Sequence, residues 1–169
     1  MKLLANALLK SKAGSKDINT FFDNNDFNHE IKFDNVVAIT QEIQFCVDSD
    51  FNKSIDNLPE SLTHLTFGYY FNQPVDQLPV SLTHLELSRE FNQPINNLPE
   101  GLIHLKLGFN FDHSVDNLPM GKGRANLTHL TMSRYFDKPV DNLPVSLIHL
   151  ELGRYFNHTV NNLPSGLQY

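Results

Sequence analysis

Histidines recur at a fixed place in the sequence, where a row of imidazoles could bind a ligand or respond to pH. They are twenty residues apart, with one longer step of twenty-five, and comprise His64, His84, His104, His129 and His149. Imidazole titrates closest to neutral pH and is also the commonest protein ligand of transition metals. On neighbouring strands, about 4.8 Å apart, the five rings would form a ladder on one exposed face.

Three roles are open to this ladder: neutral, mutually hydrogen-bonded packing, a protein-binding or pH-sensitive face, and a metal site. The metal site is least favoured, because no Cys or carboxylate column joins the histidines to complete a ligand set. Like charges in a row disfavour the protonated form. We therefore expect a neutral ladder, and we expect acidification to about pH 5 to loosen it.

A second set of candidate residues follows each expected strand, where the sequence varies while its flanks repeat. Tyr and Arg are the residues that most often anchor protein interfaces. Variable positions on a constant scaffold are where a binding module places its specificity, although a solvated rim is the alternative. The candidates are Tyr69, Arg89, Phe109, Arg134, Tyr135, Arg154 and Tyr155.

Enzyme motifs are missing from the sequence. The chain contains no Gly-x-Ser-x-Gly, His-Glu-x-x-His or Cys-x-x-Cys pattern, and Gly121-Lys122-Gly123 lacks the spacing of a phosphate-binding loop. Cys46 is expected on a strand beside Phe45, where a nucleophilic role is disfavoured. We therefore predict a protein that is not an enzyme and that needs no cofactor or metal.

Copies of one unit of about twenty residues must position these side chains. The repeated phenylalanines that give the register are Phe51, Phe71, Phe91, Phe111, Phe136 and Phe156. The one longer step holds an insertion at residues 120–124, which we expect in a surface loop. Within each copy the spacing Leu-x-x-Leu-x-Leu, as at Leu62, Leu65 and Phe67, is that of a leucine-rich repeat.

This spacing predicts a repeat solenoid with one short parallel β-strand per unit. The strands are expected at residues 63–67, 83–87, 103–107, 128–132 and 148–152. Frequent prolines predict return legs that are irregular or 3₁₀-like. Successive copies should stack a phenylalanine spine, an Ile/Val column and a Leu column inside. Two columns of Asn and Asp, beginning at Asn52 and Asp56, should accept hydrogen bonds from backbone N–H groups.

We divide the chain into a helical cap, residues 1–26, and the solenoid, residues 27–169. The cap should contain a helix over residues 2–12 and a second helical piece after Asp17. A degenerate first copy begins at residues 27–31, and its strand at residues 43–47 should point Phe45 and Val47 inward. The last copy stops after Leu163-Pro164 without a strand, which leaves an end that is frayed, an interface or truncated.

The bulk composition narrows the possible partners. The chain has 169 residues, 40% of them hydrophobic, and a formal net charge of −6. This acidity disfavours nucleic acid and anionic membranes, and no apolar run is long enough to cross a bilayer. A single cysteine fits a reducing compartment. We expect an intracellular, cytoplasmic protein.

The phrases Phe-Asn-Gln-Pro-Val/Ile, Asn-Leu-Pro and Ser-Leu-Thr-His-Leu resemble the FNIP repeat, a relative of the leucine-rich repeat. The resemblance covers about residues 51–167, and it implies an amoebal protein or one from a large DNA virus of amoebae, acting in the host cytoplasm. Members are presumed protein-interaction modules. Many resemble substrate receptors of ubiquitin ligases, which implies ligase machinery as a partner. Only about 26 residues precede the first copy here, fewer than an F-box has.

We therefore expect a protein–protein interaction module with an unidentified protein partner. A substrate-recognition adaptor is its more specific form. The alternative is a structural or self-associating repeat scaffold, which the uncovered last copy favours.

Overall fold

The computed structural model describes residues 6–11, 18–21, 40–45, 47, 50–55, 58–120 and 127–168. The degenerate copy at residues 27–31, Cys46 and the inserted residues 121–124 lie outside the described residues. The boundary between the expected cap and the solenoid also lies outside them.

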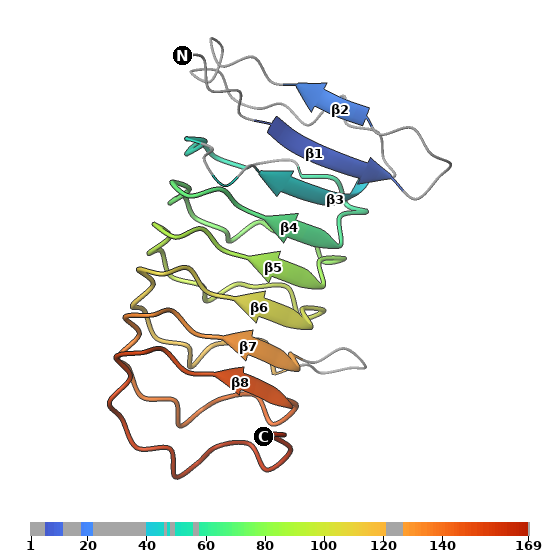
Figure 1. Cartoon of the computed structure of the whole chain (residues 1–169). Helices are drawn as coiled ribbons and strands as arrows, with labels where there is room; N and C mark the ends of the chain where they lie inside the picture. Colours follow the sequence, from blue (N-terminus) through green and yellow to red (C-terminus); the bar gives the residue numbers. More distant parts are fainter. Residues whose placement is uncertain are drawn as a thin grey trace.

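Eight strands form one sheet in the order β2-β1-β3-β4-β5-β6-β7-β8. From β3 onward every pair is parallel, and one coil of chain separates each strand from the next (Figure 1). The described return legs contain turns and bends but no helix, as the prolines predicted. The strands are β1 (Asn6–Ser11), β2 (Ile18–Phe21), β3 (Thr40–Phe45), β4 (His64–Thr66), β5 (His84–Glu86), β6 (His104–Lys106), β7 (His129–Thr131) and β8 (His149–Glu151).

Each residue of a coil lies beside its own equivalent in the next coil. Leu65 pairs with Leu85, and Leu85 pairs with Leu105. The spine phenylalanines stack with ring centroids 6.0 to 6.5 Å apart. The predicted parallel solenoid and its register from β4 to β8 are therefore confirmed.

The inner columns form one continuous hydrophobic core. The spine residues from Phe71 to Phe136 are fully buried, and the Ile/Val and Leu columns are buried in the same coils. In the last coil the same columns are more open: Phe156 and Leu163 are only partly buried and Val160 is 44% exposed. The difference follows from stacking, since each inner side chain is covered by the coils on both sides.

The first Asn/Asp column is a ladder between coils. The Oδ1 atom of Asn52 accepts a hydrogen bond of 2.8 Å from the backbone N–H of Asn72, and the pattern repeats along the column to Asn157. The predicted acceptor role is confirmed, with the donor in the following coil. The second column differs: its oxygens, as at Asp76, accept from side-chain amides, as of Asn97, so the expected backbone donors were wrong there.

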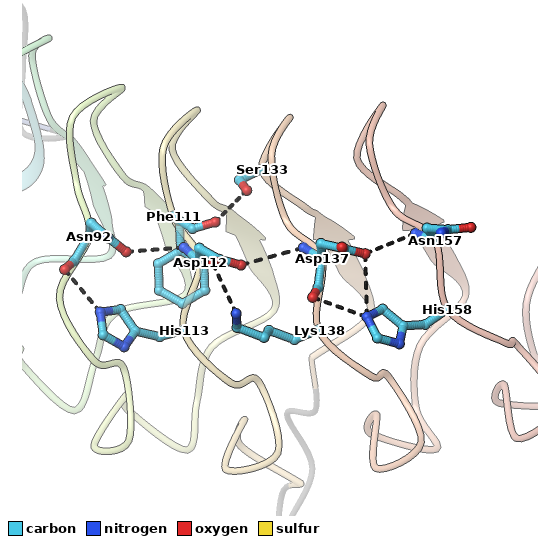
Figure 2. Close-up of polar contacts among 9 residues, drawn as sticks. All are labelled: Asn92, Phe111, Asp112, His113, Ser133, Asp137, Lys138, Asn157 and His158. Atoms are coloured by element: carbon cyan, nitrogen blue, oxygen red, sulfur yellow. Dashed lines mark hydrogen bonds and ion pairs between the residues drawn. The ribbon is translucent and has the colours of Figure 1, made fainter.

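The residue after each donor contacts the preceding member of the first column (Figure 2). Lys138 places its Nζ 2.9 Å from Asp112 Oδ2, and His158 places its Nε2 3.3 Å from Asp137 Oδ1. The hydrogen bond from Lys138 holds the pKa of Asp112 below its usual value. Where the column carries Asn52 instead, the corresponding neighbour is a neutral glutamine, Gln73.

The helix expected over residues 2–12 is wrong, because β1 occupies its central part, and β2 replaces the helical piece expected after Asp17. β1 pairs antiparallel with β2 and with β3. Without β1 this edge of β3 would expose unpaired backbone N–H and C=O groups. Tertiary pairing of this kind overrides a weak local helix propensity.

The register expected for β3 is also wrong. Ile43 pairs with Leu65, so Ile43 and Phe45 are the buried residues, and Val47 is 73% exposed. The expected register assumed the same spacing between strand and spine phenylalanine in every coil. The coil of β3 has two more residues between its strand and Phe51 than the coil of β4 has before Phe71. Phe45 accordingly stacks on Phe67, with ring centroids 5.7 Å apart.

Two residues after the end of each strand from β4 to β8, one column alternates between glycine and serine, and its first four members are buried: Gly68, Ser88, Gly108, Ser133 and the half-buried Gly153. The serine hydroxyls donate to spine carbonyls, as from Ser133 Oγ to Phe111 O at 2.5 Å. A Cβ at Gly108 would lie 1.6 Å from the backbone oxygen of Ser88, and one at Gly153 would lie 2.0 Å from that of Ser133. The backbones therefore approach too closely at Gly108 and Gly153 for any side chain there.

We expect Gly108→Ala to lower the free energy of unfolding by about 1–3 kcal/mol, because the new methyl group must displace backbone. The matched control is Gly166→Ala, whose Cβ would make an ordinary 3.5 Å contact with Leu147 O. Chemical denaturation of both variants measures the difference. Equal effects would contradict the close approach of the coils at Gly108.

Candidate binding face of the sheet

The five histidines stack face to face along the exposed side of β4 to β8. Successive ring centroids are 4.0 to 4.4 Å apart, and the planes of neighbouring rings differ by 12° to 28°. Parallel strands in register impose this contact, because side chains at the same strand position point to the same face. The predicted ladder is present.

The histidines do not bond one another as expected, since threonines are their partners. Nδ1 of His64, His84 and His129 each lies 2.8 Å from Oγ1 of the threonine before it. The Thr83 hydroxyl donates its single proton to Thr63 O, at 3.0 Å. We infer that His84 Nδ1 carries hydrogen and donates to Thr83, which leaves the Nε2 lone pair for a ligand or proton.

Packing keeps the middle of the ladder neutral. The pKa of His84 is lowered from 6.5 to about 4, first by burial and then by the neighbouring imidazoles. Burial and other imidazoles of the ladder also lower the pKa of His104 and His129. At neutral pH the middle of the ladder therefore presents hydrogen-bonding imidazoles without positive charge.

A metal centre does not fit the ladder. Metal ligands must converge on one point, whereas stacked rings direct their nitrogens side by side. In the described part of the chain, no group of three or more His, Cys, Asp or Glu side chains is placed to hold an ion.

A shallow groove of about 400 Å³ runs across the strands beside the ladder. Its other side is the variable column, which begins at Thr66 and includes an ion pair of 2.6 Å between Lys106 and Glu86. Its lining comprises Glu42, His64, Leu65, Thr66, His84, Leu85, Glu86, His104, Leu105, Lys106, His129 and Thr131. Four of the five ladder histidines thus share one open surface with residues that differ from coil to coil.

The second set of candidates forms a continuous rim at the carboxyl ends of the strands. Arg89 lies between two rings, with its Cζ 5.0 Å from the centroid of Tyr69 and 4.3 Å from that of Phe109. Arg134 Cζ lies 5.2 Å from the Phe109 centroid and 5.9 Å from that of Tyr155.

The remaining rim residues join the same cluster. Tyr135 stacks on Tyr155 at 5.0 Å and meets Phe109 edge-on at 5.0 Å. Arg154 Cζ lies 6.0 Å from the Tyr155 centroid. All seven rim residues named from the sequence are therefore brought together. We call them the arginine–aromatic rim.

Sequence reasoning missed two contributors to this face. The first is the threonine before His64, His84 and His129, which the sequence shows in three of the five copies. The second is Tyr70, which contacts Tyr69 at 4.6 Å and is 52% exposed. Both signals are present in the sequence: the Thr-His pair repeats, and Tyr135 and Tyr155 occupy the position of Tyr70 in two later copies.

Short in-register strands joined by irregular return legs define a leucine-rich-repeat type of solenoid. The FNIP Repeat family matches residues 51–90, 74–110 and 136–169, together more than half of the chain. The chain therefore belongs to the FNIP repeat family.

A solved structure supports the same class. It is described as the crystal structure of CroV588, a novel circular LRR protein, and is 45% identical to this chain with a TM-score of 0.63. The match covers 71% of this chain and 19% of that protein, so this chain corresponds to a small part of it. The comparison with curated proteins gives no match.

The described part of the chain contains no helix that is long and apolar enough to cross a membrane.

We expect the thermal unfolding midpoint to decrease as the pH is lowered from about 7 to about 5. An unfolded histidine gains its proton near its ordinary pKa of 6.5, whereas folded His84 resists protonation until about pH 4. The unfolded state thus binds more protons in this window, and stability falls as the pH falls through it. Thermal unfolding monitored by circular dichroism measures the change.

His84→Phe keeps a ring in the stack but removes the titrating group, so its thermal midpoint should depend less on pH. His113→Asn, outside the ladder, is the matched control. A pH dependence that is the same in the wild type and His84→Phe would contradict the assignment to the ladder.

Proposed function

We propose that this protein is a protein-interaction module whose recognition surface is the exposed sheet face with its adjoining rim. One observation supports this most strongly. The core columns keep the same residue types from coil to coil, whereas the variable column beside the groove changes among Thr66, Glu86, Lys106, Thr131 and Glu151.

The chemistry of the face suits a protein partner. The stacked imidazoles provide a flat, partly apolar surface whose middle stays neutral at pH 7, and the groove beside them is open. Tyr135 and Tyr155 are 46% and 49% exposed, and aromatic side chains of this kind anchor interfaces. Leucine-rich-repeat-type solenoids commonly mediate protein interactions, and no catalytic arrangement is part of this proposal.

A substrate-recognition adaptor in the cytoplasm is the more specific form of the proposal. It draws only on the likeness to family members that resemble ubiquitin-ligase receptors. The face would then hold the substrate.

Self-association is the second candidate function, with a second copy of this chain taking the place of another protein on the exposed sheet face. Light scattering at several concentrations tests this form: a mass that rises with concentration supports it, and a constant monomer contradicts it.

A bulky substitution in the groove should weaken partner binding. Proximity labelling would identify a partner, and calorimetry with the purified partner would compare the wild type with Thr131→Trp. We expect at least a roughly tenfold loss of affinity, because a bulky ring at a central contact disrupts the fit. Val80→Trp is the matched control, since Val80 is 87% exposed in a return turn.

Equal affinity of the wild type and Thr131→Trp would contradict the recognition role of the groove. Failure to find any partner that binds the purified wild-type protein directly would contradict the interaction function itself.

A further inference from the structure

The arginines of the arginine–aromatic rim have no carboxylate partners among the described residues. Two lysines of that part of the chain are neutralised: Lys106 pairs with Glu86 and Lys138 with Asp112. Arg89, Arg134 and Arg154 contact aromatic rings instead. In a chain of net charge −6, a row of three unpaired cations is unexpected on electrostatic grounds.

Stacking leaves the directional part of each guanidinium available. A guanidinium whose flat face lies against a ring keeps the N–H groups in its plane for a carboxylate, which it can bind through two parallel bonds. Holding the side chain between rings also reduces the conformational entropy that it would lose on binding. The Nε of Arg134 is buried without a hydrogen-bond partner in the described chain, so a carboxylate would bind the terminal Nη groups.

Two of these cations occupy equivalent positions. Arg134 and Arg154 lie in neighbouring coils, and both are about 6 Å from the centroid of the single ring of Tyr155 (5.9 and 6.0 Å). Like charges at equivalent positions are unfavourable, and an anion bound to both would offset that cost.

We propose that the arginine–aromatic rim binds an acidic segment of the protein partner, whose Asp or Glu carboxylates pair with Arg89, Arg134 and Arg154. The proposal deepens the function proposed above and depends on it. Arg89 and Arg134 are two coils apart, roughly 10 Å at the strand spacing. Carboxylates two or four residues apart in an extended segment point to the same side and are roughly 7 or 13 Å apart, which brackets this distance.

The distribution of charge favours an acidic protein segment over the other anions that arginine binds. A single phosphate group would be held best by several arginines converging on one point, whereas these are spread along the stack. A nucleic acid carries a negative charge on every phosphate, so the net negative charge of this protein would repel it. Between the arginines lie Phe109 and Tyr155, which can contact the apolar parts of a polypeptide.

A labelled peptide in which glutamate alternates with glycine tests the proposal by fluorescence anisotropy. We expect binding that weakens as ionic strength rises. Arg134→Gln should weaken it roughly tenfold, since a hydrogen bond to a charged group contributes about that factor. Arg134→Lys keeps the positive charge but loses the planar guanidinium group. Its affinity for the peptide should therefore lie between those of the wild type and Arg134→Gln.

Lys53→Gln is the matched control, because it removes one positive charge and places the residue found at the equivalent Gln73 and Gln93. Its affinity should equal that of the wild type. Absence of binding to the wild type, equal binding to Arg134→Gln, or equal losses in Lys53→Gln and Arg134→Gln would each overturn the proposal. Tighter binding of a phosphorylated peptide or a single-stranded oligonucleotide of equal charge would also overturn it.

The identified partner separates this inference from the function on which it depends. A partner that binds wild type and Arg134→Gln equally, but not Thr131→Trp, would leave the interaction function standing and overturn the role of the rim. Loss of partner affinity in Arg134→Gln, with an intermediate affinity in Arg134→Lys, would support the proposed role of the rim.

Discussion

In-register stacking is the constraint on which the rest of this structure depends. Because each residue lies beside its own equivalent, a column of identical apolar residues reinforces itself, as in the spine from Phe71 to Phe136. The same rule penalises columns of identical charges, and columns of side chains where the backbones approach too closely for a Cβ. Such columns are therefore neutral or alternating: Glu86 lies beside Lys106, and Gly108 follows Ser88. The histidine ladder obeys the rule through pKa values lowered by burial and by neighbouring rings.

This constraint also explains how the chain separates stability from recognition. Inward columns must keep their residue types, since each side chain contacts the coils on both sides. Outward columns face solvent and can vary as long as neighbouring charges are compatible. The groove and the arginine–aromatic rim lie on that outward side, and the solenoid holds them rigidly from the core. The three unpaired arginines depart from the pattern of matched charges, which is why an external anion is the natural partner for them.

Much of the fold followed from the sequence, because the period of twenty residues fixes the coil, the strand and the inner columns together. The histidine ladder and the seven rim residues followed from the same period. What failed lay where the period is broken: two extra residues shifted the register of β3, and long-range pairing made β1 a strand where local pattern indicated a helix. The Thr83–His84 hydrogen bond and the contact behind the Gly/Ser alternation depend on atomic distances, which spacing alone does not provide.

Cysteine cross-linking tests in-register stacking most directly. Thr66 and Glu86 are register partners on neighbouring strands, so a Thr66→Cys/Glu86→Cys variant, with Cys46 replaced by serine, should form a disulfide under mild oxidation. The control is Thr66→Cys/Lys106→Cys, whose positions are two strands apart and roughly 10 Å distant, beyond the reach of a disulfide. The structure predicts a cross-link in the first variant and none in the second. A cross-link in the control, or none in the register pair, would contradict the stacking of equivalent residues.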